Sequence, residues 1–103
     1  MLIWNNARPY RLSFPGSGRT HQPRNPLTAA VSRDGGLTWI GKKHIVEDPT
    51  LQLSNPSCMF TREGKALVSW FSSPMDDPEP PGVWGSNPMS LDAAVIDIDW
   101  FYR

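Results

Sequence analysis

The stretch Ser32-Arg33-Asp34-Gly35-Gly36-Leu37-Thr38-Trp39 decides the fold predicted for this chain. It joins two segments with strand character, Leu27–Arg33 and Trp39–Val46. Serine and aspartate side chains accept backbone N–H bonds inside turns, and glycine supplies a conformation that a side chain opposes. The stretch therefore predicts a tight β-hairpin with the Trp39 ring folded over it. In this hairpin Asp34 is a structural residue and not a catalytic one.

Composition extends the β interpretation to the rest of the sequence. The 103 residues include 11 prolines and 8 glycines, which favours many turns. Five tryptophans favour strands that pack on aromatic side chains. No segment repeats apolar residues at i, i+3, i+4 and i+7 over three turns. We therefore expect an all-β fold, and a chain of this length forms one domain at most.

Further strands are predicted on both sides of the hairpin. Leu2–Asn5 is a short strand, and Leu91–Tyr102 is the clearest long one. Cys58–Thr61 and Lys65–Phe71 form a second hairpin across Arg62-Glu63-Gly64, where glycine makes positive φ cheap. The predicted strands number about six, and turns at this spacing are typical of sandwiches, barrels or propeller blades.

Alternation assigns faces to these strands, because successive side chains of a strand point to opposite sides. Ala66, Val68 and Trp70 share one face, and Leu27, Ala29 and Val31 share a face of the earlier strand. In the last strand the apolar face is formed by Ile96, Ile98, Trp100 and Tyr102. Asp97 and Asp99 lie on its opposite face. Such a pair is typical of glycosidase or calcium chemistry, and an exposed strand face is the plainer interpretation.

Three connections are predicted between these strands. Residues 6–26 and 72–90 are long loops, and loops of this length are usually functional or disordered, while Glu47–Pro56 is a simple connection. Trp84 in the second loop is a candidate for stacking on a sugar ring. The run Pro78–Gly82 is either a polyproline II ligand for an aromatic groove or a stiff surface loop.

Charge and cysteine content exclude several classes of protein. Lys+Arg and Asp+Glu are both 10, and no basic patch of the kind that binds nucleic acid is visible. The longest apolar runs are about five residues, whereas a membrane span needs about 20. The N-terminus has no signal-peptide pattern. The single cysteine, Cys58, is expected to be a buried inert thiol. One cysteine and two distant histidines cannot form a zinc site. We expect no metal and no cofactor.

Three other groups of polar residues are weaker candidates. His21 lies near Arg24 and is either a general base or a surface histidine. His44 is expected to be solvated. Weak calcium binding and plain solvation are the two interpretations of the acidic loop residues Asp76, Asp77 and Glu79.

The turn at Ser32–Trp39 resembles the Asp-box, Ser-x-Asp-x-Gly-x-x-Trp, of the sialidase superfamily and other BNR-repeat proteins. The similarity extends at varying strength from about Leu2 to Tyr102. It implies antiparallel β-propeller blades, about two of a six-bladed propeller, as a single partial domain over residues 1–103. In this family the box joins the third and fourth strands of a blade, on the side away from the active site. Ser32, Asp34, Gly36 and Trp39 are its structural residues.

The same resemblance implies a site for an acidic sugar. Arg24, just before the strand that enters the box, resembles the third arginine of the triad that grips the sialic acid carboxylate with a guanidinium fork. Asn55 stands where the family has its tyrosine nucleophile, and asparagine cannot form the aryl glycoside intermediate. The other catalytic residues belong to earlier blades. The loops 6–23 and 72–90, with Trp84, would shape the pocket.

Two functions follow as expectations. The first is a fragment of a sialidase-like glycoside hydrolase, whose family hydrolyses terminal sialic acid or a similar acidic sugar, and which is inactive as this isolated chain. The alternative is a non-catalytic Asp-box propeller module that binds carbohydrate or protein, and Asn55 favours it. A structural remnant without a ligand is a third possibility. Self-association is expected in each case, because open blade edges invite strand pairing.

Overall fold

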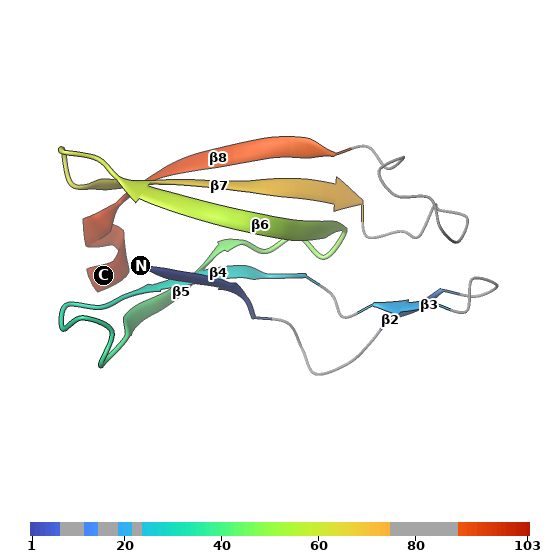
Figure 1. The fold of residues 1–103 in the computed structure, drawn as a ribbon, viewed down its shortest axis with the longest axis horizontal. Helices are drawn as coiled ribbons and strands as arrows, with labels where there is room; N and C mark the ends of the chain where they lie inside the picture. The colour runs from blue at the N-terminus through green and yellow to red at the C-terminus, as the bar shows by residue number, and fades with distance from the viewer. Residues whose placement is uncertain (7–11, 15–18, 22–23, 75–88) are drawn as a thin grey trace.

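The computed structural model describes residues 1–6, 12–14, 19–21, 24–74 and 89–103 (Figure 1). This part of the chain is all-β, with eight strands, one 3-10 helix and no α-helix. The elements in chain order are β1 (Leu2–Asn5), β2 (Leu12–Phe14), β3 (Arg19–His21), β4 (Leu27–Val31), β5 (Ile40–Val46), β6 (Leu51–Phe60), β7 (Lys65–Pro74), β8 (Ser90–Asp97) and η1 (Ile98–Tyr102).

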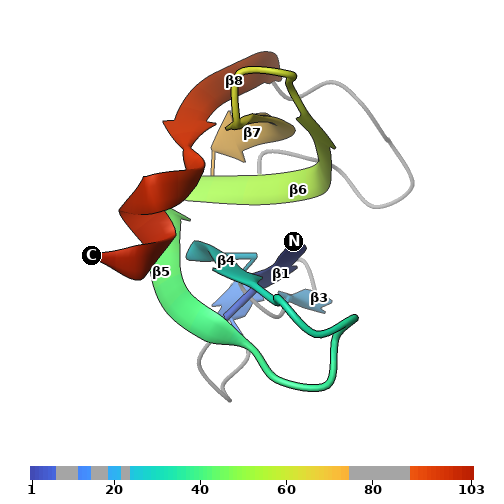
Figure 2. The same ribbon diagram turned by 90° about the vertical axis from the view of Figure 1, so that its left-hand side faces the viewer.

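The strands form two three-stranded antiparallel sheets and one small hairpin. One sheet has the order β1-β4-β5 and the other β6-β7-β8, and the hairpin is β2-β3. Figures 1 and 2 show the two larger sheets lying face to face, with η1 beside β5 and β8 at one end. The β4–β5 turn lies at that same end, and the β2-β3 hairpin lies at the other.

Both predicted hairpins are present. The Asp-box stretch connects β4 to β5, and the turn at Gly64, where φ is +75°, connects β6 to β7. Ala66, Val68 and Trp70 are all buried on one face of β7, as alternation predicted. These two turns depend on residues adjacent in sequence, which is why the sequence alone located them.

The three predicted connections are partly wrong. Residues 6–26 contain the β2-β3 hairpin, so this segment is not one continuous loop. The connection assigned to Glu47–Pro56 ends early, because β6 begins at Leu51. β7 continues to Pro74, so the second loop starts later than predicted. Pairing between Leu51 and Pro74 extends both β6 and β7 through residues with low strand propensity.

The last strand also ends earlier than predicted. β8 stops at Asp97, whose side chain accepts a hydrogen bond from the Asp99 N–H at 3.2 Å and so caps η1. Aspartate favours such local bonds over a strand ladder. Within η1 the buried residue is Phe101, at 2% exposure, while Tyr102 is exposed. The predicted shared face for Asp97 and Asp99, and the apolar face running to Tyr102, are therefore wrong.

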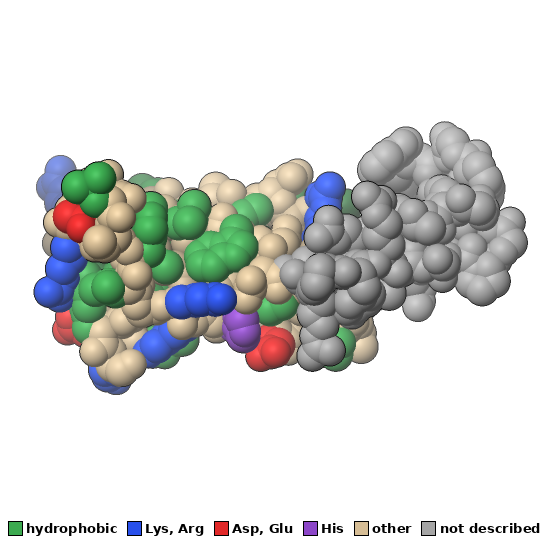
Figure 3. Space-filling view, turned by 90° about the horizontal axis from the view of Figure 1, so that it is seen from below, with side chains coloured by type: hydrophobic (Ala, Val, Ile, Leu, Met, Phe, Trp, Pro, Cys, Tyr) green, Lys and Arg blue, Asp and Glu red, His purple; other side chains and the backbone are tan. Residues whose placement is uncertain are grey.

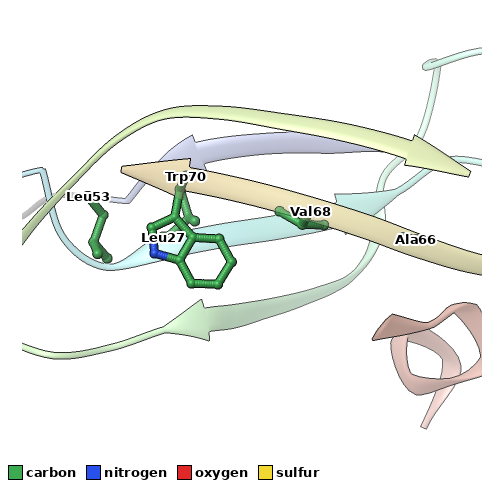
Figure 4. Close-up of a cluster of buried hydrophobic side chains, with 5 residues drawn as sticks. All are labelled: Leu27, Leu53, Ala66, Val68 and Trp70. Atoms are coloured by element: carbon green, nitrogen blue, oxygen red, sulfur yellow. The ribbon is translucent and has the colours of Figure 1, made fainter. Parts of the chain in front are cut away.

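The main hydrophobic core lies between the two sheets (Figure 4). It joins β4, β6 and β7 through the buried side chains of Leu27, Leu53, Ala66, Val68 and Trp70. A second cluster lies beside it, where Phe101 of η1 packs on Ala29 and Val31 of β4. The two sheets therefore form one packed unit, and η1 packs against one end of it.

The central strand β4 is buried on both faces. Thr28 points to the side opposite the core, and its hydroxyl lies 2.8 Å from Nδ1 of His44 on β5. Lys42 lies over the Trp4 ring on this outer side, with Nζ 6.0 Å from the ring centroid. Figure 3 shows the surface from this side, where lysine, arginine, histidine and hydrophobic side chains lie together. The outer face of β1-β4-β5 is thus mixed in polarity.

Candidate functional site

The Asp-box turn is held by hydrogen bonds to Ser32 and Asp34. The Ser32 hydroxyl accepts the N–H of Gly36 at 2.8 Å and donates to Asp34 Oδ1 at 2.7 Å. Asp34 Oδ1 also accepts the Thr38 N–H at 2.9 Å, and its Oδ2 accepts the Thr38 hydroxyl at 2.6 Å. All of these groups lie inside the turn, so both oxygens of the Asp34 carboxylate are hydrogen-bonded within its own hairpin.

The pKa of Asp34 and the packing of Trp39 also show that these side chains interact within the turn. The hydroxyl and N–H of Thr38, followed by the hydroxyl of Ser32, lower the pKa of Asp34 from 3.8 to about 2. Gly36 has a φ of +92°, and the Trp39 ring lies 3.5 Å from where a Cβ at this position would stand. The ring thus covers the glycine. The geometry assigns the four Asp-box residues to the turn itself.

The hydrogen bonds of the Asp34 carboxylate should weaken only at very low pH. An Asp34→Ala variant should lack these hydrogen bonds at every pH. The folded pKa lies below the ordinary value, so the ionised carboxylate contributes stability that is fully present above about pH 4 and lost as the pH falls toward 2. We expect Asp34→Ala to lower Tm by a few degrees at neutral pH and to converge with the parent in acid. Thermal unfolding across this range measures the difference. Asp99→Ala is the control, and an unchanged gap at low pH contradicts the role of the charge.

Arg24 lies at the end of β4 opposite the Asp-box turn. Its backbone is fixed on both sides: its carbonyl accepts the Leu53 N–H at 2.9 Å, and its N–H donates to Gln52 Oε1 at 2.7 Å. Its side chain is exposed, and among the described residues no carboxylate forms an ion pair with it. The guanidinium therefore projects from a fixed backbone without a partner in the described part of the chain.

Asparagine side chains join the two sheets around this arginine. Asn25 Nδ2 donates to the carbonyl of Leu51 at 3.0 Å and also to that of Asp48. Asn5 Nδ2 donates to the carbonyl of Leu53 at 3.0 Å. We call Asn5, Arg24, Asn25 and Gln52 the polar seam. Of these four residues, the sequence pointed only to Arg24, because the others are defined by contacts between distant segments.

Asn55 lies further along the same strand. It is exposed and adopts a φ of +50°, inside the β-bulge between Ser54 and Ser57. Asparagine tolerates this conformation better than most residues. It follows Leu53 by two residues, about 7 Å along the strand, so the polar seam and the bulge are neighbours on β6. No described hydrogen bond joins Asn55 to Arg24.

Among the described residues, the remaining candidates are His44 and Cys58. His44 is exposed as expected, although its ring also bonds the buried Thr28 hydroxyl. Cys58 is half-buried, and not fully buried as expected. This partial burial raises the pKa of its thiol, which lies 3.8 Å from the sulfur of Met1. Among the described residues, no three His, Cys, Asp or Glu side chains gather as a metal site requires. Trp84, Asp76, Asp77, Glu79, the Pro78–Gly82 run and the side chain of His21 lie outside the described residues.

No family model, curated protein or solved structure matches this chain. Within the described residues, no helix has the length and apolar character needed to cross a bilayer. The description of the all-β fold and of the polar seam thus rests on the structure of this chain and not on a related protein.

Proposed function

We propose that the chain is a portion, about two blades, of a sialidase-like β-propeller. Two features support this. The sheets β1-β4-β5 and β6-β7-β8 are successive antiparallel units packed face to face, as neighbouring blades are. The Asp-box turn connects the last two strands of the first sheet, which is its place in that family.

The proposed role of the chain is to bind an acidic sugar through Arg24. The observation that carries this role is the fixed backbone and exposed guanidinium of Arg24, at the end of the sheets opposite the Asp-box. A guanidinium fork binds a carboxylate by two parallel hydrogen bonds. Gln52 of the polar seam, whose Oε1 accepts the Arg24 N–H, supplies an amide group next to this residue, and amides suit sugar hydroxyls. Binding of this kind requires no cofactor.

Catalysis by this chain alone is not part of the proposal. In the family, terminal sialic acid is hydrolysed with a tyrosine nucleophile, and Asn55 lacks a hydroxyl to attack the sugar. The chain thus corresponds to a sialidase-like hydrolase fragment without its own turnover. The second candidate, a non-catalytic propeller module that binds carbohydrate, is favoured by the same residue.

A titration with N-acetylneuraminic acid tests the proposal, with NMR chemical shifts as the measurement. Replacing Arg24 with alanine should weaken binding by about tenfold or more, because hydrogen bonds to charged groups contribute about 1.5–3 kcal/mol each. Arg24→Lys should recover only part of the affinity, since lysine lacks the fork. The matched control is Arg62→Ala, which removes an exposed arginine from the β6–β7 turn at the other end of the molecule.

Two outcomes would contradict the proposal. Unchanged affinity in Arg24→Ala would exclude the arginine as the ligand contact. Equal binding of the methyl ester of the sugar would show that the carboxylate is not recognised. A fluorogenic sialoside assay on the parent and on Asn55→Tyr tests the absence of turnover that both candidates share, because clear turnover by the parent would overturn the view that Asn55 disables the nucleophile.

A further inference from the structure

The strand β8 has one edge without a described partner. Its other edge pairs with β7 without any register shift. The hydrogen bond from the Ile98 N–H to the Gly64 carbonyl sets the phase of this ladder, so alternate residues of β8 direct their backbone groups to β7. The intervening residues Leu91, Ala93 and Val95 direct theirs away from it. Among the described residues, no hydrogen bond satisfies these outward groups.

Among the described residues, most of the devices that usually protect an exposed strand are missing from this edge. Such devices are bulges, prolines, lysines or a covering segment, and β8 contains no bulge, proline or lysine. Of the other edges of the two larger sheets, that of β6 carries a bulge and bonds Arg24, that of β5 lies against η1, and that of β1 is only four residues long. The side chains of Leu91 and Val95 are 67% and 64% exposed. An apolar, regular edge of this length is suited to accept another strand.

We propose that β8 pairs with β8 of a second copy of this chain, antiparallel and about a two-fold axis at Ala93. In this register Leu91 of one copy lies opposite Val95 of the other, and Ala93 lies opposite Ala93. The outward N–H and C=O groups of all three residues then bond across the interface. The register uses the whole segment from Ser90 to Ile96, and the three apolar side chains continue the same sheet face.

Charge and space both favour a copy of β8 as the occupant. In the proposed register Asp92 faces Ala94 and Asp97 faces Met89, so no two carboxylates lie directly opposite each other. An open groove of about 300 Å³ lies beside the C-terminal half of β8. It is lined by Ile45, Ala94, Val95, Ile96, Asp97, Trp100 and Arg103. The incoming strand would run along this groove, and two three-stranded sheets would become one of six.

Analytical ultracentrifugation of the full chain over a wide dilution series tests the pairing. The parent should be a dimer that dissociates on dilution. Ala93→Lys and Ala93→Glu should each be monomeric, because like charges would meet at the axis. An equimolar mixture of the two variants should restore the dimer, since Lys and Glu then face each other. Circular dichroism should show both variants folded, because Ala93 is exposed.

Two further variants keep the test decisive. Ala93→Pro removes an N–H that points away from β7, which an edge strand tolerates, and it should also abolish the dimer. Ser57→Lys places a charge on the exposed β6 strand, away from the β8 edge, and should leave the dimer intact. Loss of the dimer in Ser57→Lys would indicate stacked sheet faces instead of paired edges. A monomeric parent, or dimeric Ala93→Lys, would overturn the proposal.

Discussion

A Gly41→Ala variant should be largely unfolded under conditions in which the parent is folded. Gly41 lies in β5 with a φ of +67°, directly beneath η1. A Cβ at this position would stand 2.0 Å from the carbonyl oxygen of Phe101 and 2.8 Å from its carbonyl carbon. Both are backbone atoms, so no rotamer change relieves the contact, and η1 must move away from β5.

The expected loss in the free energy of unfolding has two parts. A left-handed conformation costs a residue with a side chain about 1–2 kcal/mol. Displacing η1 also exposes Phe101, which is 2% exposed and packs on Ala29 and Val31, and losing a buried aromatic side chain costs about 3–5 kcal/mol. Domains are stable by only about 5–15 kcal/mol. The sum therefore removes most of the stability of a domain of this size.

Urea denaturation followed by circular dichroism measures this effect against a matched glycine. Gly64 has a similar φ of +75° in the β6–β7 turn, but nothing lies within 4 Å of its Cβ position. Gly64→Ala should therefore lose only the conformational part, about 1–2 kcal/mol. Equal losses in the two variants would show that η1 does not bear on Gly41.

Much of the fold could be predicted because its turns are encoded locally. The Asp-box and the turn before Gly64 each place polar and glycine residues where the chain reverses, and both hairpins formed there. The N-terminal half of β6 could not be predicted in this way. Its strand state comes from the ladder with β7, whose paired residues lie 17 to 23 positions away in sequence, and not from the propensities of its own residues.

The last residues of the chain depart from the structure that their alternation predicts. Residues 96–102 alternate as a strand does, yet β8 ends at Asp97, which caps η1 from Ile98 onward, and Phe101 is buried in place of Tyr102. A local hydrogen bond thus outweighs alternation. At the candidate site, resemblance pointed to Arg24, whereas Asn5 and Asn25 bond carbonyls on segments 48 and 23–26 positions away. Contacts of this range leave no periodic signal in the sequence.

Replacing Trp70 with alanine should separate the two sheets. Trp70 is 7% exposed and lies in the same core cluster as Leu27 of β4 and Leu53 of β6 (Figure 4). Its indole N–H donates to the Ser72 hydroxyl at 3.1 Å, which in turn donates to Asp92 at 2.5 Å. Removing a buried tryptophan costs about 3–5 kcal/mol. We expect Trp70→Ala to lose most of its cooperative unfolding transition in urea.

A conservative variant separates the ring from its hydrogen bond. Trp70→Phe keeps an aromatic ring in the core but removes the N–H, so it should lose about 1–3 kcal/mol, including a small cavity. Trp39→Ala is the control, because that ring is 44% exposed and lies over Gly36 of the Asp-box turn. A larger loss in Trp39→Ala than in Trp70→Ala would contradict the packing of the sheets. With the expected order, the stability of the chain comes from the contact between its two sheets, and the Asp-box turn contributes only locally.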